Sequence, residues 1–279
     1  MKGTMRFRPC CLTRRSEKAV RGSEKIGDVK LNTGNVLGVE FAASTTEEAV
    51  RLTAAHIKDL SGGYICFSNV HTTVMACDDE GYRDILNGSA LTFPDGAPVA
   101  RLLRKQGLGA ERVAGPDFMG EMFDHSRNDC GLSHFFYGSR EDTLSKLKER
   151  LTDRYPGLRI AGMYSPPFRK LTEEEDVNIT EMIRSSGAEL IWVGLGAPRQ
   201  ERWMADHKGL FDGVMLGVGA GFDFHAGTVK RAPESWQKLG FEWLYRLLSD
   251  PKRLFGRYLV TNTKFILYTH SPGGRLQIF

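Results

Sequence analysis

An aspartate directly after a short apolar run is the first residue whose position in this sequence suggests chemistry. The run covers residues 91–93 and ends at Pro94, and Asp95 and Gly96 then precede a helical pattern that starts near Pro98. In open α/β sheets, ligands bind where strands end and helices begin. A carboxylate at that place can act as a general base. It can equally cap the following helix, and the residues alone leave both interpretations open.

Other strand ends carry polar residues or glycines that a parallel sheet would bring to the same edge. They are Asn69, preceded by Ser68, and the stretches GLGAPRQERW (194–203) and GVGAGFDF (217–224). Glycine turns let backbone amides approach a ligand, and the N-terminus of a helix favours phosphate. The pattern indicates a nucleotide diphosphate site, for which the candidate nucleotide-binding residues are Gly138, Gly194, Gly196, Gly217, Gly219 and Asp223.

Each polar candidate also has a simpler interpretation. Asn69 fits an ordinary turn, and Asp223 fits a turn cap. Gln200 and Glu201 fit the solvated first turn of a helix, where Glu suits the helix dipole. His225 is of a residue type that more often packs or faces solvent than binds a ligand.

Several classes of protein are disfavoured by the motifs. The glycine turns lack the last glycine of GxGxxG and do not lie near the first strand, which counts against a dinucleotide-binding enzyme. There is no P-loop, and no HxH, DxD or HExxH pattern that would indicate a metal, so we expect neither metal nor cofactor. Five scattered cysteines without CxxC spacing favour a reducing, cytoplasmic compartment. A net charge of +4 is too weak to indicate nucleic acid as a partner.

Strands and helices that alternate along the chain must position these residues. The predicted strands cover 64–69, 90–93, 134–138, 158–164, 189–196 and, with its glycine turn, 213–221; the predicted helices cover 44–60, 71–86, 97–106, 141–155 and 173–186. The first helix opens with a candidate capping box from Ser44 to Glu47. The alternation predicts an α/β fold for residues 31–228, Rossmann-like, with a mainly parallel sheet and helices on both faces.

The two ends of the chain differ from this central part in composition. Residues 1–30 are basic and poor in apolar side chains, which predicts a mobile tail. Residues 229–279 have helical spacing, and the segment from Lys230 to Lys264 holds eight basic and three acidic residues interleaved with aromatics. We expect a helical appendage that meets a membrane surface, although such charges also suit a solvated helix face. No run approaches the roughly 20 apolar residues of a membrane span.

Five stretches, taken in order, resemble the WecG/TagA/CpsF glycosyltransferases from about residue 35 to about residue 260. They are FPDGAPVARLLRKQG, ERVAGPDFM, FFYGSREDTLSKLKERLTDRYPGLRIAGMYSPPF, IWVGLGAPRQERW and GVGAGFDFHAGTVKRAPESWQKLGFEWLYRLLSDPKRLFGRY. The resemblance implies transfer of a sugar from a UDP-sugar to a polyprenyl-diphosphate-linked sugar on the inner face of the cytoplasmic membrane. It further implies inversion of configuration, no required metal, and a place in the biosynthesis of cell-surface polymers such as exopolysaccharides.

The resemblance also assigns roles to particular residues. Asp95 matches the family's proposed base, Gln200 is similar to a residue that contacts the sugar, and Asn69 matches the asparagine after the first core strand. Members often have Thr two positions before that asparagine, where this chain has Phe67. The donor sugar therefore stays open between an N-acetylmannosamine type and another hexose. The candidate substrate contacts are Asn69, Ser68, Gly96, Arg199, Gln200, Glu201, Arg231, Arg253 and Arg257, with Arg246 next.

Two other classes of function remain as alternatives. One is a nucleotide-binding, Rossmann-like enzyme such as an oxidoreductase, which the lack of an early GxGxxG disfavours. The other is a non-catalytic protein that binds lipid carriers, which would bind a UDP-sugar without releasing UDP. The sequence leaves open the acceptor sugar, the polymer, the role of residues 1–30 and the oligomeric state, including a homo-oligomer.

Overall fold

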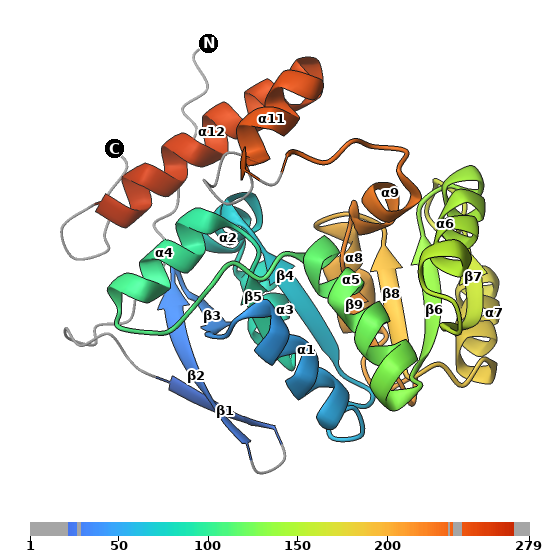
Figure 1. The fold of residues 1–279 in the computed structure, drawn as a ribbon. Helices are drawn as coiled ribbons and strands as arrows, with labels where there is room; N and C mark the ends of the chain where they lie inside the picture. The colour runs from blue at the N-terminus through green and yellow to red at the C-terminus, as the bar shows by residue number, and fades with distance from the viewer. Residues whose placement is uncertain (1–21, 27–28, 234, 237–241, 271–279) are drawn as a thin grey trace.

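A six-stranded sheet, in which all neighbouring strands run parallel, forms the centre of the molecule (Figure 1). The computed structural model describes residues 22–26, 29–233, 235–236 and 242–270, without the side chains of 22–30, Arg253 and Arg257. In spatial order the strands are β5 (Leu91–Pro94), β4 (Tyr64–Ser68), β9 (Val214–Gly217), β8 (Leu190–Gly194), β6 (Ser133–Gly138) and β7 (Arg159–Tyr164). The predicted Rossmann-like α/β fold is confirmed.

Helices cover both faces of the sheet because its central strands are apolar on both sides. In β4, Ile65 and Phe67 belong to one buried core, whereas Tyr64 and Cys66 belong to the other. The first core also contains residues of α1 (Thr46–Ala55), α5 (Gly115–His125), α6 (Glu141–Arg154) and α9 (Gly221–Ala226). The second contains residues of α2 (Val70–Asp78), α3 (Glu80–Asn87), α4 (Ala97–Lys105), α7 (Glu173–Ser185) and α8 (Arg199–Asp206). A single π-helical turn, η1 (Ser126–Cys130), extends α5.

A small antiparallel sheet precedes the main one. It contains β1 (Gly22–Ile26), β2 (Val29–Val36) and β3 (Val39–Ala42), in that spatial order. Leu37 and Gly38 both have positive φ values (53° and 89°), which suit the tight turn between β2 and β3. The prediction of a tail over residues 1–30 is therefore wrong for β1 and the start of β2, and its remainder, 1–21, lies outside the described residues.

Two helix predictions need correction. The single helix expected over 71–86 is two helices, because Asp79 has an extended backbone (φ −124°, ψ 106°) and its side chain accepts a hydrogen bond from the Tyr82 N–H that begins α3. The capping box of α1 lies one residue later than expected: the Thr45 hydroxyl accepts from Glu48 N at 3.1 Å, and the Glu48 carboxylate accepts from Thr45 N at 2.9 Å. Helix α5 was not predicted.

The C-terminal part is helical as expected, with α11 (Glu242–Ser249) and α12 (Pro251–His270). Figure 1 shows both helices above α2 and α4, at the end of the molecule where the parallel strands terminate. Helix α12 is anchored on α2, since Phe265 is buried and the Lys264 ammonium lies 2.6 Å from a carboxylate oxygen of Asp78. Of the helices in the described part of the chain, none combines the length and the apolar composition needed to cross a membrane.

The connections around β4 and β9 create a crevice at the carboxyl ends of the strands. These strands are neighbours, yet α2 leaves β4 toward one face and α9 leaves β9 toward the other. Ligands of open α/β sheets bind at such points. The fold therefore predicts the location of the site before any side chain is considered.

Candidate active site

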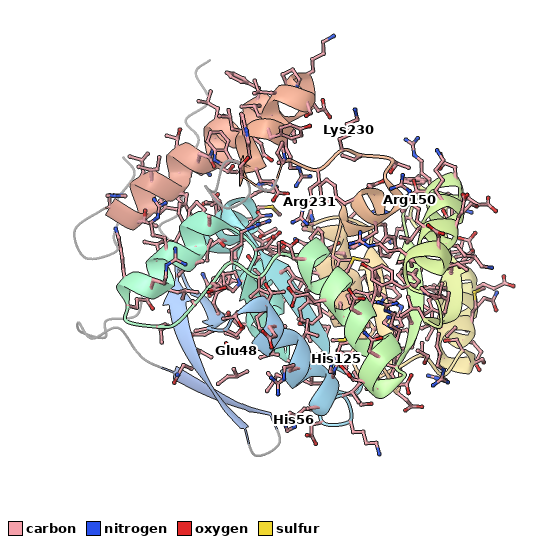
Figure 2. The ribbon with its side chains drawn as sticks, in the orientation of Figure 1. Glu48, His56, His125, Arg150, Lys230 and Arg231 are labelled. Carbon is pink, nitrogen blue, oxygen red and sulfur yellow. The ribbon has the colours of Figure 1, made fainter. Side chains whose placement is uncertain are left out.

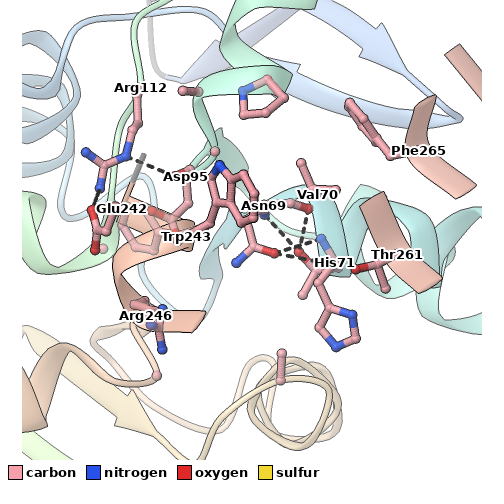
Figure 3. Close-up of a pocket in the computed structure, with 18 of the residues that line it drawn as sticks. Asn69, Val70, His71, Asp95, Arg112, Glu242, Trp243, Arg246, Thr261 and Phe265 are labelled. Atoms are coloured by element: carbon pink, nitrogen blue, oxygen red, sulfur yellow. Dashed lines mark hydrogen bonds and ion pairs between the residues drawn. The ribbon is translucent and has the colours of Figure 1, made fainter. Parts of the chain in front are cut away.

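A cavity of about 880 Å³ opens at this crevice, and α12 forms its outer wall (Figure 3). Its size suits a substrate as large as a nucleotide-linked sugar. The inner wall consists of the ends of β4, β5 and β9 with the first turns of α2 and α4, and residues of α11 and α12 complete the enclosure.

Asp95 lies in the inner wall of the cavity, directly after β5. Its N–H donates to the carbonyl oxygen of Ser68 at 3.0 Å, which fixes the loop to the end of β4. The N-cap of α4 is Gly96, and no side chain hydrogen-bonds to the helix start. The capping interpretation of Asp95 is therefore wrong. Burial raises the pKa of this carboxyl group to about 7, with Arg112 opposing the rise.

Arg112 also holds this loop, and no motif in the sequence indicated it. Its Nε donates to the backbone oxygen of Asp95 at 3.2 Å, and its Nη2 donates to Glu242 Oε2 at 2.6 Å (Figure 3). Both Arg112 and Glu242 line the cavity, and their side chains are only 20% and 16% exposed. The first residue of α11 is therefore coupled through one guanidinium to the loop of the candidate base.

Arg231 belongs to the same cluster but does not line the cavity. Both of its terminal nitrogens donate to the Asp117 carboxylate, and its Nε lies 3.8 Å from Glu242 Oε1. Figure 2 shows Arg231 on the segment that follows α9. The structure gives this predicted substrate contact an internal partner, so Arg231 fixes the segment between α9 and α11 to the start of α5.

Four cationic side chains nevertheless line the cavity, beside three carboxyl groups. Arg246 of α11 lines it, with its guanidinium 5.7 Å from the ring centre of Phe224. The other cationic lining residues are Arg101, Lys105 and Arg112. Planar guanidinium groups of this kind recognise phosphate oxygens in pairs. Side chains of the two further predicted arginines, Arg253 and Arg257, lie outside the described residues.

Asn69 lines the cavity and caps α2, so it belongs to a helix start and not to an ordinary turn. Its Oδ1 accepts from the N–H groups of His71 at 3.0 Å and Thr72 at 3.4 Å. The cap uses the amide oxygen, which leaves the NH₂ group available to a ligand. Ser68 is different: it is 1% exposed, its hydroxyl lies 2.8 Å from the Thr72 hydroxyl, and it is not a lining residue.

Gln200 and Glu201 also line the cavity, but they are almost completely buried (4% and 2% exposed). The interpretation as a solvated helical turn is therefore wrong. Gln200 Oε1 accepts from Gly196 N at 3.1 Å, while its Nε2 donates to Gly217 O at 3.0 Å and to Glu201 Oε1 at 2.7 Å. The Gln200 amide thus joins the two glycine turns. Burial raises the pKa of Glu201, with the Gln200 hydrogen bond opposing that rise.

The predicted glycines divide into two groups. Gly196, Gly217 and Gly219 line the cavity, and the first and last have positive φ values of 77° and 52°. Gly138 and Gly194 do not line it. They allow β6 and β8 to approach, because a Cβ at Gly138 would stand 2.6 Å from the carbonyl carbon of Gly194.

Three more sequence candidates lie away from the cavity walls. Asp223 accepts a hydrogen bond from the Thr228 hydroxyl at 3.2 Å, which agrees with its interpretation as a turn cap. Arg199 is exposed and borders a separate small pocket of about 40 Å³ beside Phe168. His225 packs edge-to-face on Phe123 with its Nε2 2.9 Å from the Pro116 oxygen, and burial lowers its pKa. The packing interpretation of His225 is confirmed.

The described residues contain no group of three or more His, Cys, Asp or Glu side chains arranged to hold a metal ion. The charged side chains that do line the cavity carry guanidinium, ammonium and carboxylate groups. Together with a carboxyl group of raised pKa and two glycine turns at the edge of a parallel sheet, they form a site suited to an anionic, nucleotide-like ligand.

The chain belongs to the glycosyl transferase WecG/TagA/CpsF family, whose profile matches residues 34–272. The match spans the parallel sheet, the whole cavity wall described above and both C-terminal helices. Family membership makes the protein a glycosyltransferase, with a nucleotide-sugar donor and an acceptor as its substrates. The resemblance noted from the sequence is confirmed.

Proposed function

We propose that the protein is an inverting, metal-independent glycosyltransferase that moves a sugar from a UDP-sugar to a polyprenyl-diphosphate-linked sugar. The donor sugar is of the N-acetylmannosamine type or another hexose, and the product enters cell-surface polysaccharide biosynthesis. The observation that carries the proposal is Asp95, a carboxyl group of raised pKa in the wall of a cavity rich in arginine.

Asp95 acts as the general base in this mechanism. An acceptor hydroxyl attacks the anomeric carbon of the donor from the face opposite UDP, and its proton passes to the Asp95 carboxylate. The bond between the anomeric carbon and the β-phosphate oxygen breaks, and UDP leaves with the electron pair. A pKa of about 7 suits this role, since a base works best when its pKa lies near the operating pH.

Fixed positive charge stabilises the leaving UDP. Arg246 and Arg112 line the cavity, and the turns at Gly196 and Gly219 offer backbone amides. Preorganised donors of this kind stabilise charge that develops in the transition state without reorganisation. We therefore propose that these groups do the work that a divalent cation does in other glycosyltransferases.

The proposed place of action is the inner face of the cytoplasmic membrane. Supporting it, α12 exposes large apolar side chains, among them Phe255 (59% exposed) and Leu259 (58%), which lie one helical turn apart. Exposed apolar residues with neighbouring basic ones are typical of a surface that rests on anionic lipid.

A donor screen tests the function. Purified full-length protein is incubated with a panel of UDP-sugars and a polyprenyl-diphosphate-linked sugar, with and without EDTA, and UDP release is measured. We expect release with one donor class, dependence on the acceptor, and the same rate in EDTA. Binding of UDP-sugars without release would support a lipid-carrier binding protein instead, and loss of activity in EDTA would contradict metal independence.

A further inference from the structure

One arm of the cavity extends away from Asp95, between α4 and α12, and its composition differs from that of the inner end. We call this region the α4–α12 arm and define it by Arg101, Leu102, Lys105, Phe265, Ile266 and His270, all of which line the cavity. Residues 101 and 105 are one turn apart on α4, and residues 266 and 270 are one turn apart on α12. Each helix therefore presents a continuous stripe to the arm.

Among the described residues, neither cation of the arm has an ion-pair partner. Arg101 and Lys105 are both exposed, and within the described part of the chain neither is paired with a carboxylate. This contrasts with Arg112, whose guanidinium is already bonded to Glu242. Two unpaired cations one turn apart, in the wall of a cavity, are suited to a ligand with two adjacent negative charges.

Apart from His270, the other residues of the arm are apolar. Leu102 lies next to Arg101 on α4, and Phe265 and Ile266 line the arm from α12. Ile266 is 57% exposed although it lines the cavity, so the arm opens to the outside there. A ligand that combines phosphate with a hydrocarbon chain would place its phosphate against the two cations and its hydrocarbon chain against the apolar side chains of the arm.

The spacing along α4 relates this arm to the candidate base. Helix α4 starts directly after Asp95 and Gly96. At a rise of about 1.5 Å per residue, Arg101 stands about 6 Å beyond Ala97 along the axis, and Lys105 about 6 Å further. One sugar ring fits between the base and the first cation.

We propose that the α4–α12 arm is the binding site for the acceptor's lipid diphosphate: Arg101 and Lys105 hold the diphosphate, and Leu102, Phe265 and Ile266 contact the first isoprenoid units. This inference rests on the proposed function and names the subsite of its second substrate. The acceptor's sugar then lies toward Asp95, and the hydrocarbon chain leaves the arm past Ile266 toward the membrane side.

The diphosphate of the donor is the competing occupant, so the experiment must separate the two. The test variant is Arg101→Gln/Lys105→Gln in the full-length protein. The control is Lys146→Gln/Lys148→Gln, which removes the same charge from two exposed positions of α6. Farnesyl diphosphate and UDP serve as binding probes, and inorganic diphosphate tests whether the hydrocarbon chain matters.

We expect the test variant to bind farnesyl diphosphate at least about 10-fold more weakly, because two charge-assisted contacts are lost. Its affinity for UDP should stay within about twofold of the wild type, and the control should match the wild type with both probes. Wild-type protein should bind farnesyl diphosphate more tightly than inorganic diphosphate. Unchanged affinity for farnesyl diphosphate, or an equal loss for UDP, would overturn the assignment.

Steady-state kinetics give a second readout. In the test variant the KM for the lipid acceptor should rise while the KM for the UDP-sugar is retained, and a rise in the donor KM alone would assign the two cations to UDP. If wild-type protein transfers no sugar to any lipid-linked acceptor, the proposed function fails, whereas the binding experiment still decides what the arm recognises.

Discussion

Glu242, the first residue of α11, accepts a hydrogen bond from Arg112 at 2.6 Å, and the same guanidinium donates to the backbone oxygen of Asp95. The C-terminal helices are thus linked to the candidate base by one side chain. Glu242 also raises the pKa of Asp95, in addition to the larger effect of burial, whereas Arg112 lowers it. The appendage therefore affects the chemistry of the inner wall as well as enclosing it.

Glu242→Gln should shift the pH dependence of transfer toward acid. The substitution removes a negative charge that raises the pKa of Asp95 and leaves Arg112 with less neutralisation, and both changes favour the carboxylate. In the wild type, kcat/KM should rise with pH through about 7, as Asp95 loses its proton. We expect the pH midpoint of this rise in kcat/KM to be lower by roughly half a pH unit to one pH unit in the variant. Glu149→Gln, an exposed residue of α6, is the matched control; a variant profile identical to that of the control would contradict the coupling.

Asp95→Asn should stabilise the protein at high pH more than at low pH. The pKa of Asp95 is about 7 in the folded protein and about 4 in an unfolded chain. Between these values the folded state holds a proton that the unfolded state releases, so the stability of the wild type falls as pH rises through this window. The wild type loses at most about 4 kcal/mol in its free energy of unfolding across this pH window, and solvent that reaches the side chain reduces this loss. Thermal unfolding at pH 5 and pH 8 measures it, and an equal Tm difference at both pH values would show that the carboxyl group has an ordinary pKa.

Phe255→Ser/Leu259→Ser should weaken binding to vesicles of anionic phospholipid without unfolding the protein, because both side chains are more than half exposed. Each apolar side chain contributes about 1.5–3 kcal/mol when it is fully buried in an apolar phase, so a loss of at least about 10-fold in partitioning is expected. Val177→Ser/Met182→Ser on α7 removes comparable exposed apolar surface (66% and 43%) as a control. Equal binding of both variants would show that α12 is not the lipid-facing element.

The sequence was sufficient to predict which strand ends meet at the cavity, because strand ends are local features. Asp95, Asn69 and the turns at Gly196 and Gly219 each follow an apolar run, and a parallel sheet brings such ends to one edge. The same reasoning also selected Gly138 and Gly194, whose lack of a side chain instead allows two neighbouring strands to approach each other. Strand ends identify an edge, but they do not distinguish a ligand contact from a packing contact.

The parts that the sequence did not predict depend on contacts between distant segments. Arg112 and Glu242 are 130 positions apart, and neither belongs to a motif with a mechanism of its own. Arg231 was expected at the substrate because its segment resembles one that contributes arginines to the family's active site, whereas its position is set by Asp117. Charge composition predicted a basic C-terminal appendage, but only the folded chain shows which cations have internal partners.

The most direct test of the central claim is transfer by Asp95→Asn under single-turnover conditions, with the donor identified by the screen and a lipid-linked acceptor. The variant keeps the shape of the side chain and removes its ability to take a proton. UDP affinity, measured by calorimetry, should remain within about twofold of the wild type, while the rate of sugar transfer falls about 10²–10⁴-fold. A variant that retains more than about a third of the wild-type rate would contradict the assignment of Asp95 as the general base.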